Sequence, residues 1–209
     1  MSQTDTAVNG KTRAPRQPWN ATDLGLIAVF AALVAGAALV PGIPANAFGI
    51  PITFQTLAVM LTGLVLGAGR GFAAVGLYTL LGLAGLPIFS GGRSGLGILA
   101  GPSAGYIIAF PIAAAVVGWL AAVVIRRVGG ARTLWLFAAA TVTSIAVVHS
   151  LGIAGIVINT KAPLGQAFVA DLVFYPGDII KNVLAAVIAV ALHRAFPDLL
   201  VRRARQPAK

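Results

Sequence analysis

Long apolar stretches alternate with short polar or glycine-rich ones along most of the chain. The apolar runs cover residues 24–40, 53–69, 71–86, 105–125, 133–158 and about 168–192. Most are close to the roughly 20 residues that an α-helix needs to cross a bilayer core. The pattern therefore predicts an all-α membrane protein with six transmembrane helices.

The segments between these runs carry turn-forming residues. Pro41, Pro44 and Pro51 predict an extended loop after the first helix. The glycine-rich turn at residues 67–71 predicts a tight helical hairpin, and residues 88–105 form a second glycine-rich stretch. We expect three regions: a disordered polar tail at 1–23, a helical domain at 24–196 and a basic tail at 197–209.

Composition strengthens the membrane assignment. Of the 209 residues, 58% are hydrophobic and 10% are charged, whereas a soluble domain carries about 25% charged residues. The chain has no cysteine, which excludes disulfides and thiolate metal sites. Its net charge of +10 comes from basic residues near the ends and in loops, so we expect contact with lipid and no binding of nucleic acid.

The basic residues also predict the orientation. With the N-terminus inside, only Arg93 and Lys161 fall on the outer side, and Lys181 lies within the membrane. The other twelve fall inside: Lys11, Arg13, Arg16, Arg70, Arg126, Arg127, Arg132, Arg194, Arg202, Arg203, Arg205 and Lys209. This asymmetry predicts that both termini are cytoplasmic.

Two charges inside the last apolar run mark a candidate site. Asp178 and Lys181 each cost roughly 2.5–3.5 kcal/mol at the centre of a membrane helix. Three residues apart, they share one helix face and can reach each other or a common ligand. Pro176 either kinks this helix or starts a new one nearer the outer surface. The alternative is a buried ion pair that only fixes helix packing.

Other polar residues are expected at the same outer end. Arg93 lies in the glycine-rich loop, and Gln55 and Tyr106 lie where two helices begin. Together with Asp178 and Lys181 they could line a partly buried pocket in which a cation takes a ligand carboxylate and Asp178 accepts N–H groups. The plainer interpretations are a solvated loop charge for Arg93 and ordinary helix-end residues for the other two.

Small residues recur four apart on the first helix. They are spaced so that another helix can approach closely, which is consistent with a docking face for a partner or with internal packing. The positions are Ala28, Ala32 and Gly36, with Ala31 and Ala35 beside them.

Several motifs together resemble one family of membrane proteins. They are LPIFSGGRSGLG at 86–97, GPSAGY at 101–106, YPGDIIK at 175–181 and TFQT at 53–56. The chain resembles BioY, the biotin-specific substrate-binding (S) component of energy-coupling-factor (ECF) transporters, from about residue 24 to residue 196. Its sequence at 101–105 is GPSAG, whereas the family usually has GPTGG, so each difference exchanges one small residue for another.

The resemblance implies an ECF S-component fold in a prokaryotic cell membrane. It implies that Asp178, Lys181 and Arg93 contact biotin near the outer surface. It also implies that the small residues of the first helix dock on a transmembrane coupling subunit driven by two ATPase subunits. Biotin would be the transported ligand, and no cofactor is expected.

Two rival functions remain open. A solitary ion-coupled vitamin carrier would use Asp178 as its ion site, although the chain lacks an evident inverted repeat. An intramembrane serine protease would use Ser94, but its nucleophile needs a neighbouring histidine, and His193 is expected at the opposite membrane face. His149 is expected to be packed or hydrogen-bonded within the fifth helix. We therefore expect no catalysis. Neither histidine has a metal ligand at suitable sequence spacing, so we also expect no bound metal.

Overall fold

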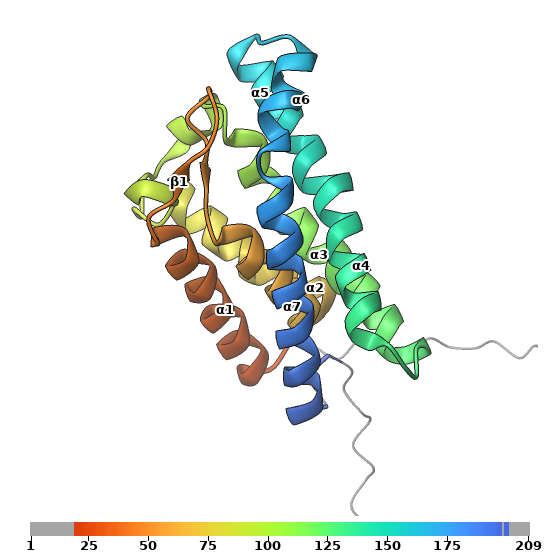
Figure 1. Ribbon diagram of the computed structural model, residues 1–209. Coiled ribbons are helices and arrows are strands. Elements are labelled where there is room, and N and C mark those ends of the chain that lie inside the picture. The colour runs from red at the N-terminus through yellow and green to blue at the C-terminus, as the bar shows by residue number, and fades with distance from the viewer. Residues whose placement is uncertain (1–18, 198, 201–209) are drawn as a thin grey trace, which may run out of the picture.

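The computed structural model describes residues 19–197 and 199–200, and it is mostly helical (Figure 1). The predicted tails lie largely outside this part of the chain. Five of the described helical stretches are long and apolar enough to cross a membrane. The main helices are α1 (Ala21–Leu39), α2 (Gln55–Leu83), α3 (Ala104–Arg127), α4 (Arg132–Thr143), α5 (Ser150–Thr160), α6 (Leu164–Leu172) and α7 (Tyr175–Ala195).

The α2 segment contains the predicted hairpin. Its backbone leaves the helical conformation at Gly67, where φ is +79° and favours glycine. The two arms then run side by side, because a Cβ atom added at Gly71 would lie 3.1 Å from the Cα of Gly63. In a straight helix, eight residues would separate these positions by about 12 Å. The predicted pair of apolar helices at 53–69 and 71–86 is therefore present within α2.

The α4 and α5 helices form one continuous rod. They are joined by η3 (Ser144–His149), a stretch of π-helix, so residues 132–160 correspond to the single predicted run at 133–158. The predicted last run, in contrast, is divided. It becomes the short α6 and the longer α7, which meet at Val173 and Phe174, and Pro176 lies in the first turn of α7. Of the two possibilities for Pro176, the start of a new helix is the one observed.

The two ends of the bundle differ (Figure 1). At one end, Arg70 of the α2 hairpin forms an ion pair with Asp23 of α1, at 3.2 Å, and donates a hydrogen bond to the carbonyl of Leu199. This contact brings both ends of the described chain to the hairpin turn. The other end carries the connecting loops, among them η1 (Ser90–Gly92) and η2 (Leu96–Ala100).

The proline-rich loop is more ordered than expected. Its strands β1 (Ile43–Pro44) and β2 (Pro51–Ile52) pair antiparallel, with Ile43 opposite Ile52. The hairpin tip is held by Asn46, whose side-chain oxygen accepts hydrogen bonds from the backbone N–H groups of Phe48 and Ile50. An extended loop was predicted, and a short β-ribbon is found.

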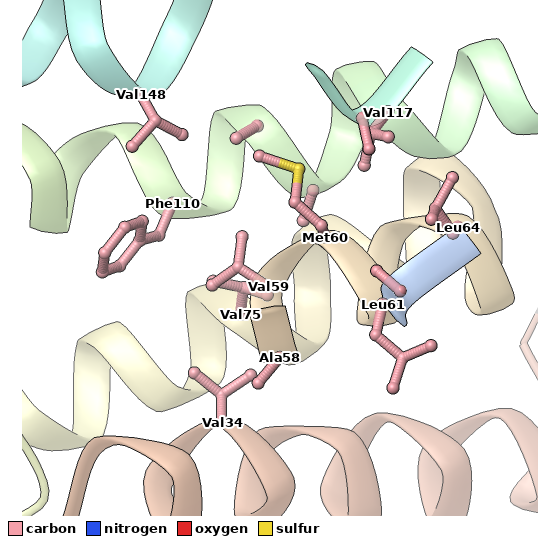
Figure 2. Close-up of a cluster of buried hydrophobic side chains, with 14 of the residues drawn as sticks. Val34, Ala58, Val59, Met60, Leu61, Leu64, Val75, Phe110, Val117 and Val148 are labelled. Atoms are coloured by element: carbon pink, nitrogen blue, oxygen red, sulfur yellow. The ribbon is translucent and has the colours of Figure 1, made fainter. Parts of the chain in front are cut away.

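The core lies where α2 and α3 pack together, with α1, α4 and α7 around them. Val59 and Met60 of the first α2 arm, Val75 of the second arm and Val117 of α3 are fully buried (Figure 2). Close approach depends on small residues, since a Cβ atom at Gly63 would lie 2.4 Å from the carbonyl oxygen of Ala114. This packing holds the first turns of α2, α3 and α7 near one another at the loop end.

Candidate substrate-binding site

A pocket opens at the loop end of the bundle. Its empty volume is about 610 Å³, a figure that includes space open to solvent. The walls come from the β-ribbon, the glycine-rich loop, helices α2, α3 and α7 and the π-helical segment η3. They are mostly apolar, with Phe89, Phe110, Phe174, Ile98, Ile107 and Val148 among them.

The predicted pair on α7 lies in this pocket and is bonded to α2. Lys181 Nζ lies 2.8 Å from Asp178 Oδ1, and the same oxygen accepts a hydrogen bond from the Thr56 hydroxyl at 2.8 Å. Lys181 also donates to Thr56, at 3.2 Å. Both charges are largely buried, so this triangle compensates each of them with a polar partner.

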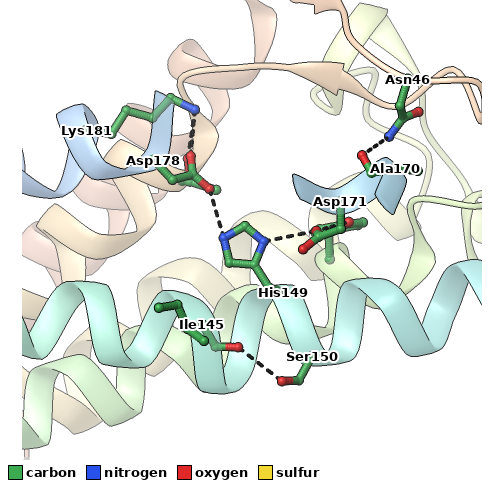
Figure 3. Close-up of polar contacts among 10 residues, drawn as sticks. Asn46, Ile145, His149, Ser150, Ala170, Asp171, Asp178 and Lys181 are labelled. Atoms are coloured by element: carbon green, nitrogen blue, oxygen red, sulfur yellow. Dashed lines mark hydrogen bonds and ion pairs between the residues drawn. The ribbon is translucent and has the colours of Figure 1, made fainter. Parts of the chain in front are cut away.

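A second carboxylate lies behind the pocket wall. Asp171 of α6 is fully buried, and its Oδ1 accepts a hydrogen bond from the Tyr106 hydroxyl at 2.6 Å. His149 Nδ1 lies 3.0 Å from the same oxygen, and His149 Nε2 lies 3.5 Å from Asp178 Oδ2 (Figure 3). The His149 ring is stacked on Tyr175, with ring centroids 4.2 Å apart. The imidazole therefore links α6 to α7.

The π-helical turn positions this histidine. His149 ends η3, where the wider turn lets the hydroxyl of Ser150 donate to the carbonyl of Ile145, five residues earlier (Figure 3). Such turns are rare and occur frequently at functional sites. Here the turn places the imidazole of His149 in the pocket wall.

The other three predicted residues also line the pocket. Arg93 is exposed at its mouth and donates through Nε to the carbonyl of Ser90 at 3.1 Å. Within residues 19–197 and 199–200, no carboxylate forms an ion pair with it. Gln55 donates to the Tyr78 hydroxyl at 2.7 Å. The structure thus brings all five residues together, but the polar groups of Gln55 and Tyr106 already have protein partners.

Residues 10–198 match the BioY family. The chain belongs to this family. Among curated BioY proteins, the "Biotin transporter BioY" of Rhizobium etli is 41% identical over 86% of this chain and 97% of its own length. That of Rhodobacter capsulatus is 40% identical over 85% of this chain and 96% of its own length. The resemblance to the family seen in the sequence motifs is confirmed.

A solved crystal structure has the same architecture. It is described as the S-component for biotin from an ECF-type ABC transporter, and it superposes with a TM-score of 0.78 at 28% identity. The match covers 83% of this chain and 91% of the other. The chain is therefore a mostly helical, multi-pass membrane protein with an ECF S-component as structural neighbour.

Sequence reasoning did not include three polar residues of this site. Asp171 was overlooked although it is a third charge in the last apolar run, a signal that could have been used. His149 was expected to be hydrogen-bonded, and it is, but its place in the pocket wall was not predicted. Thr56 lies in a quoted motif without an assigned role. The partners of His149 lie more than 20 residues away in sequence, so spacing along one helix could not find them.

The small residues of α1 do not all share one environment. Ala28, Ala32 and Gly36 are exposed on the outside of the bundle, and a Cβ atom at Gly36 would meet nothing within 4 Å. Ala31 is buried in the core and Ala35 is partly buried. Only Ala28, Ala32 and Gly36 therefore form a face that another helix could approach.

The geometry also bears on the rival chemistries. Ser94 is exposed. His149 contacts Asp171 and Asp178, and His193 contacts the carbonyl of Leu64. The spacing argument against metal binding missed the two carboxylates near His149. Even so, no group of three or more potential metal ligands suited to an ion occurs among the described residues.

Proposed function

We propose that this chain captures biotin in the pocket at the loop end of the bundle and serves in biotin uptake. In this proposal six transmembrane helices, counting the two arms of α2 separately, span a prokaryotic cell membrane. Both termini are cytoplasmic, as the twelve basic residues on that side favour, and the pocket opens outward. The names of the BioY relatives and of the structural neighbour support this substrate.

The observation that carries the proposal is the chemistry of the pocket. Biotin has an apolar bicycle, a ureido group with N–H donors and a carboxylate at the end of a chain. The aromatic and aliphatic wall suits the bicycle, and Asp178 supplies an acceptor for the ureido N–H groups. Arg93 at the mouth is the cation whose guanidinium has no carboxylate partner among the described residues, so we assign it to the biotin carboxylate.

We further propose that transport needs a coupling module. The exposed face formed by Ala28, Ala32 and Gly36 is suited to close contact with a helix of a transmembrane coupling subunit, which two ATPase subunits would drive. Binding at the outer face would be followed by ATP-dependent release inside. A solitary ion-coupled carrier remains the alternative, because the pocket contains buried ionisable groups.

Titration calorimetry of the purified chain with biotin tests the binding step. Co-purified biotin is first removed by unfolding and refolding or by exhaustive dialysis. We expect 1:1 binding that is lost or strongly weakened in Asp178→Asn and Lys181→Ala. Lys161→Asn is the matched control, because Lys161 is an exposed loop cation with φ of +59°, which asparagine tolerates. A folded chain that does not bind biotin would overturn the substrate assignment.

Reconstitution in liposomes separates the two transport mechanisms. The coupled mechanism predicts biotin uptake only when coupling and ATPase subunits and ATP are present. Uptake by this chain alone that depends on an ion gradient would favour the solitary carrier.

A further inference from the structure

His149 is the group in the pocket wall that faces two carboxylates at once. Its Nδ1 lies 3.0 Å from Asp171 Oδ1 and its Nε2 lies 3.5 Å from Asp178 Oδ2 (Figure 3). We propose that His149 carries a proton on both ring nitrogens and in that form positions Asp178 for the substrate. The part of this proposal that concerns substrate rests on the proposed function.

The hydrogen-bonding capacity of imidazole leads to this inference. A neutral imidazole has one N–H donor, and its other nitrogen is an acceptor, whereas an imidazolium donates from both. In either neutral tautomer, one nitrogen lone pair would face a carboxylate oxygen. Stacking on Tyr175 restricts rotation of the ring away from this arrangement. Only the doubly protonated ring presents an N–H group to both carboxylates, at 3.0 and 3.5 Å.

The partners of the carboxylates support the same assignment. Asp171 Oδ1 already accepts from Tyr106, and Asp171 Oδ2 is buried without a hydrogen-bond partner among the described residues. A proton on Oδ2 would therefore have no acceptor. Asp178 Oδ1 accepts from both Thr56 and Lys181. These contacts favour both carboxylates as anions.

Charge balance across the whole cluster points the same way. The ionisable groups that face His149, directly or through one partner, are Asp171 on α6, Asp178, Lys181 and Tyr175 on α7, and Tyr106 on α3. With neutral tyrosines and a neutral His149, two buried carboxylates would face one ammonium. A doubly protonated His149 gives two anions and two cations. An uncompensated charge in a buried site is costly.

The consequence for the site is a fixed carboxylate. One oxygen of Asp178 is held by Thr56 and Lys181 and the other by His149, which comes from a different helix. His149 is thus a positioning residue, because it acts on the substrate through Asp178. It also couples the short α6 helix, through Asp171, to the pocket.

Nitrogen-15 NMR of the full-length chain tests the protonation state without any ligand. The chain contains two histidines, so a His193→Gln variant with a histidine-free affinity tag leaves His149 as the only imidazole. We expect both ring nitrogens to show the shifts and N–H couplings of an imidazolium. A nitrogen with the shift of an unprotonated imidazole would overturn the proposal. Because biotin is absent, this result is independent of the proposed function.

A rescue experiment tests the positioning role by biotin titration. His149→Gln is expected to weaken binding about tenfold or more, since glutamine cannot compensate two carboxylates. Adding Asp171→Asn removes one carboxylate and should restore most of the lost affinity. His193→Gln, away from the pocket, is the binding control, and thermal unfolding of each variant checks folding.

The results of the two experiments distinguish failure of this proposal from failure of the proposed function. If His149 served only to fill space, the double variant would bind as weakly as the single variant or more weakly, and the proposal would be wrong. Unchanged affinity in His149→Gln would also overturn the positioning role. If the wild-type chain does not bind biotin, the proposed function fails, while the NMR result still decides the state of His149.

Discussion

Two buried charge clusters lie at opposite ends of this bundle, and they differ in what surrounds them. At the terminal end, Arg70 and Asp23 join the α2 hairpin, α1 and the backbone at Leu199, with side chains 13% and 3% exposed. At the loop end, Lys181 and Asp178 are similarly buried, at 11% and 6%, but they line a cavity. Burial of charge alone therefore does not distinguish the two clusters, whereas the cavity beside Asp178 and Lys181 makes theirs the candidate binding site.

The largest effect should come from the cavity cluster. Asp178→Asn removes the negative charge and one oxygen of the proposed ureido acceptor, and it leaves Lys181 without its counter-ion. Losing one member of a buried charge pair costs about 2–5 kcal/mol, which is a loss of affinity of about 30-fold or more. Calorimetry with biotin measures this directly. Asp23→Asn is the matched substitution at the other end, and it should leave the affinity of folded protein unchanged; a comparable loss there would erase the distinction.

The terminal cluster should instead affect stability. Asp23 and Arg70 take part in further contacts, so a double-mutant cycle with Asp23→Asn and Arg70→Gln is needed to isolate their pair. For residues in direct contact we expect a coupling of about 0.5–3 kcal/mol in the free energy of unfolding. Equilibrium unfolding in mixed micelles provides the measurement. Absence of coupling, or a loss of biotin affinity in both single variants, would contradict a purely structural role.

A smaller effect is expected at the mouth of the pocket. Arg93→Gln removes an exposed cation, and contacts of exposed charges contribute little. We expect a loss of biotin affinity of about two- to fivefold, together with a weaker dependence of binding on salt. Lys161→Asn should change neither quantity. If Arg93→Gln abolished binding, the arginine would have to be enclosed in the bound state.

The fold was largely accessible from the sequence because bilayer-length apolar runs are a strong signal. The α2 hairpin followed from the glycines at 67–71, and Gly67 indeed adopts a positive φ. The β-ribbon was not predicted, since its two strands are two residues long and contain a proline each. The break between α6 and α7 had only Pro176 as its signal, within an otherwise continuous apolar run.

The site was predictable only in part, for a physical reason. Asp178 and Lys181 lie three residues apart on one helix, so their proximity follows from helical geometry. Tyr106, His149 and Asp171 come from three helices, and Tyr106 and Asp171 are 65 residues apart. Such contacts depend on how the helices pack, which the apolar pattern does not specify. Motif resemblance indicated the family, but it did not reveal the histidine between two carboxylates.

The smallest effect on the isolated chain is expected on α1. Gly36→Leu adds a side chain where nothing lies within 4 Å, so biotin affinity should not change and helix propensity should add up to about 1 kcal/mol of stability. If Ala28, Ala32 and Gly36 form the docking face, the same substitution should abolish ATP-driven uptake in liposomes that contain the coupling module. Val142→Leu, at an exposed position on α4 rather than on α1, is the matched control and should transport normally. Normal uptake by Gly36→Leu would place the docking surface elsewhere, because a leucine at that position would hold an approaching helix away from α1.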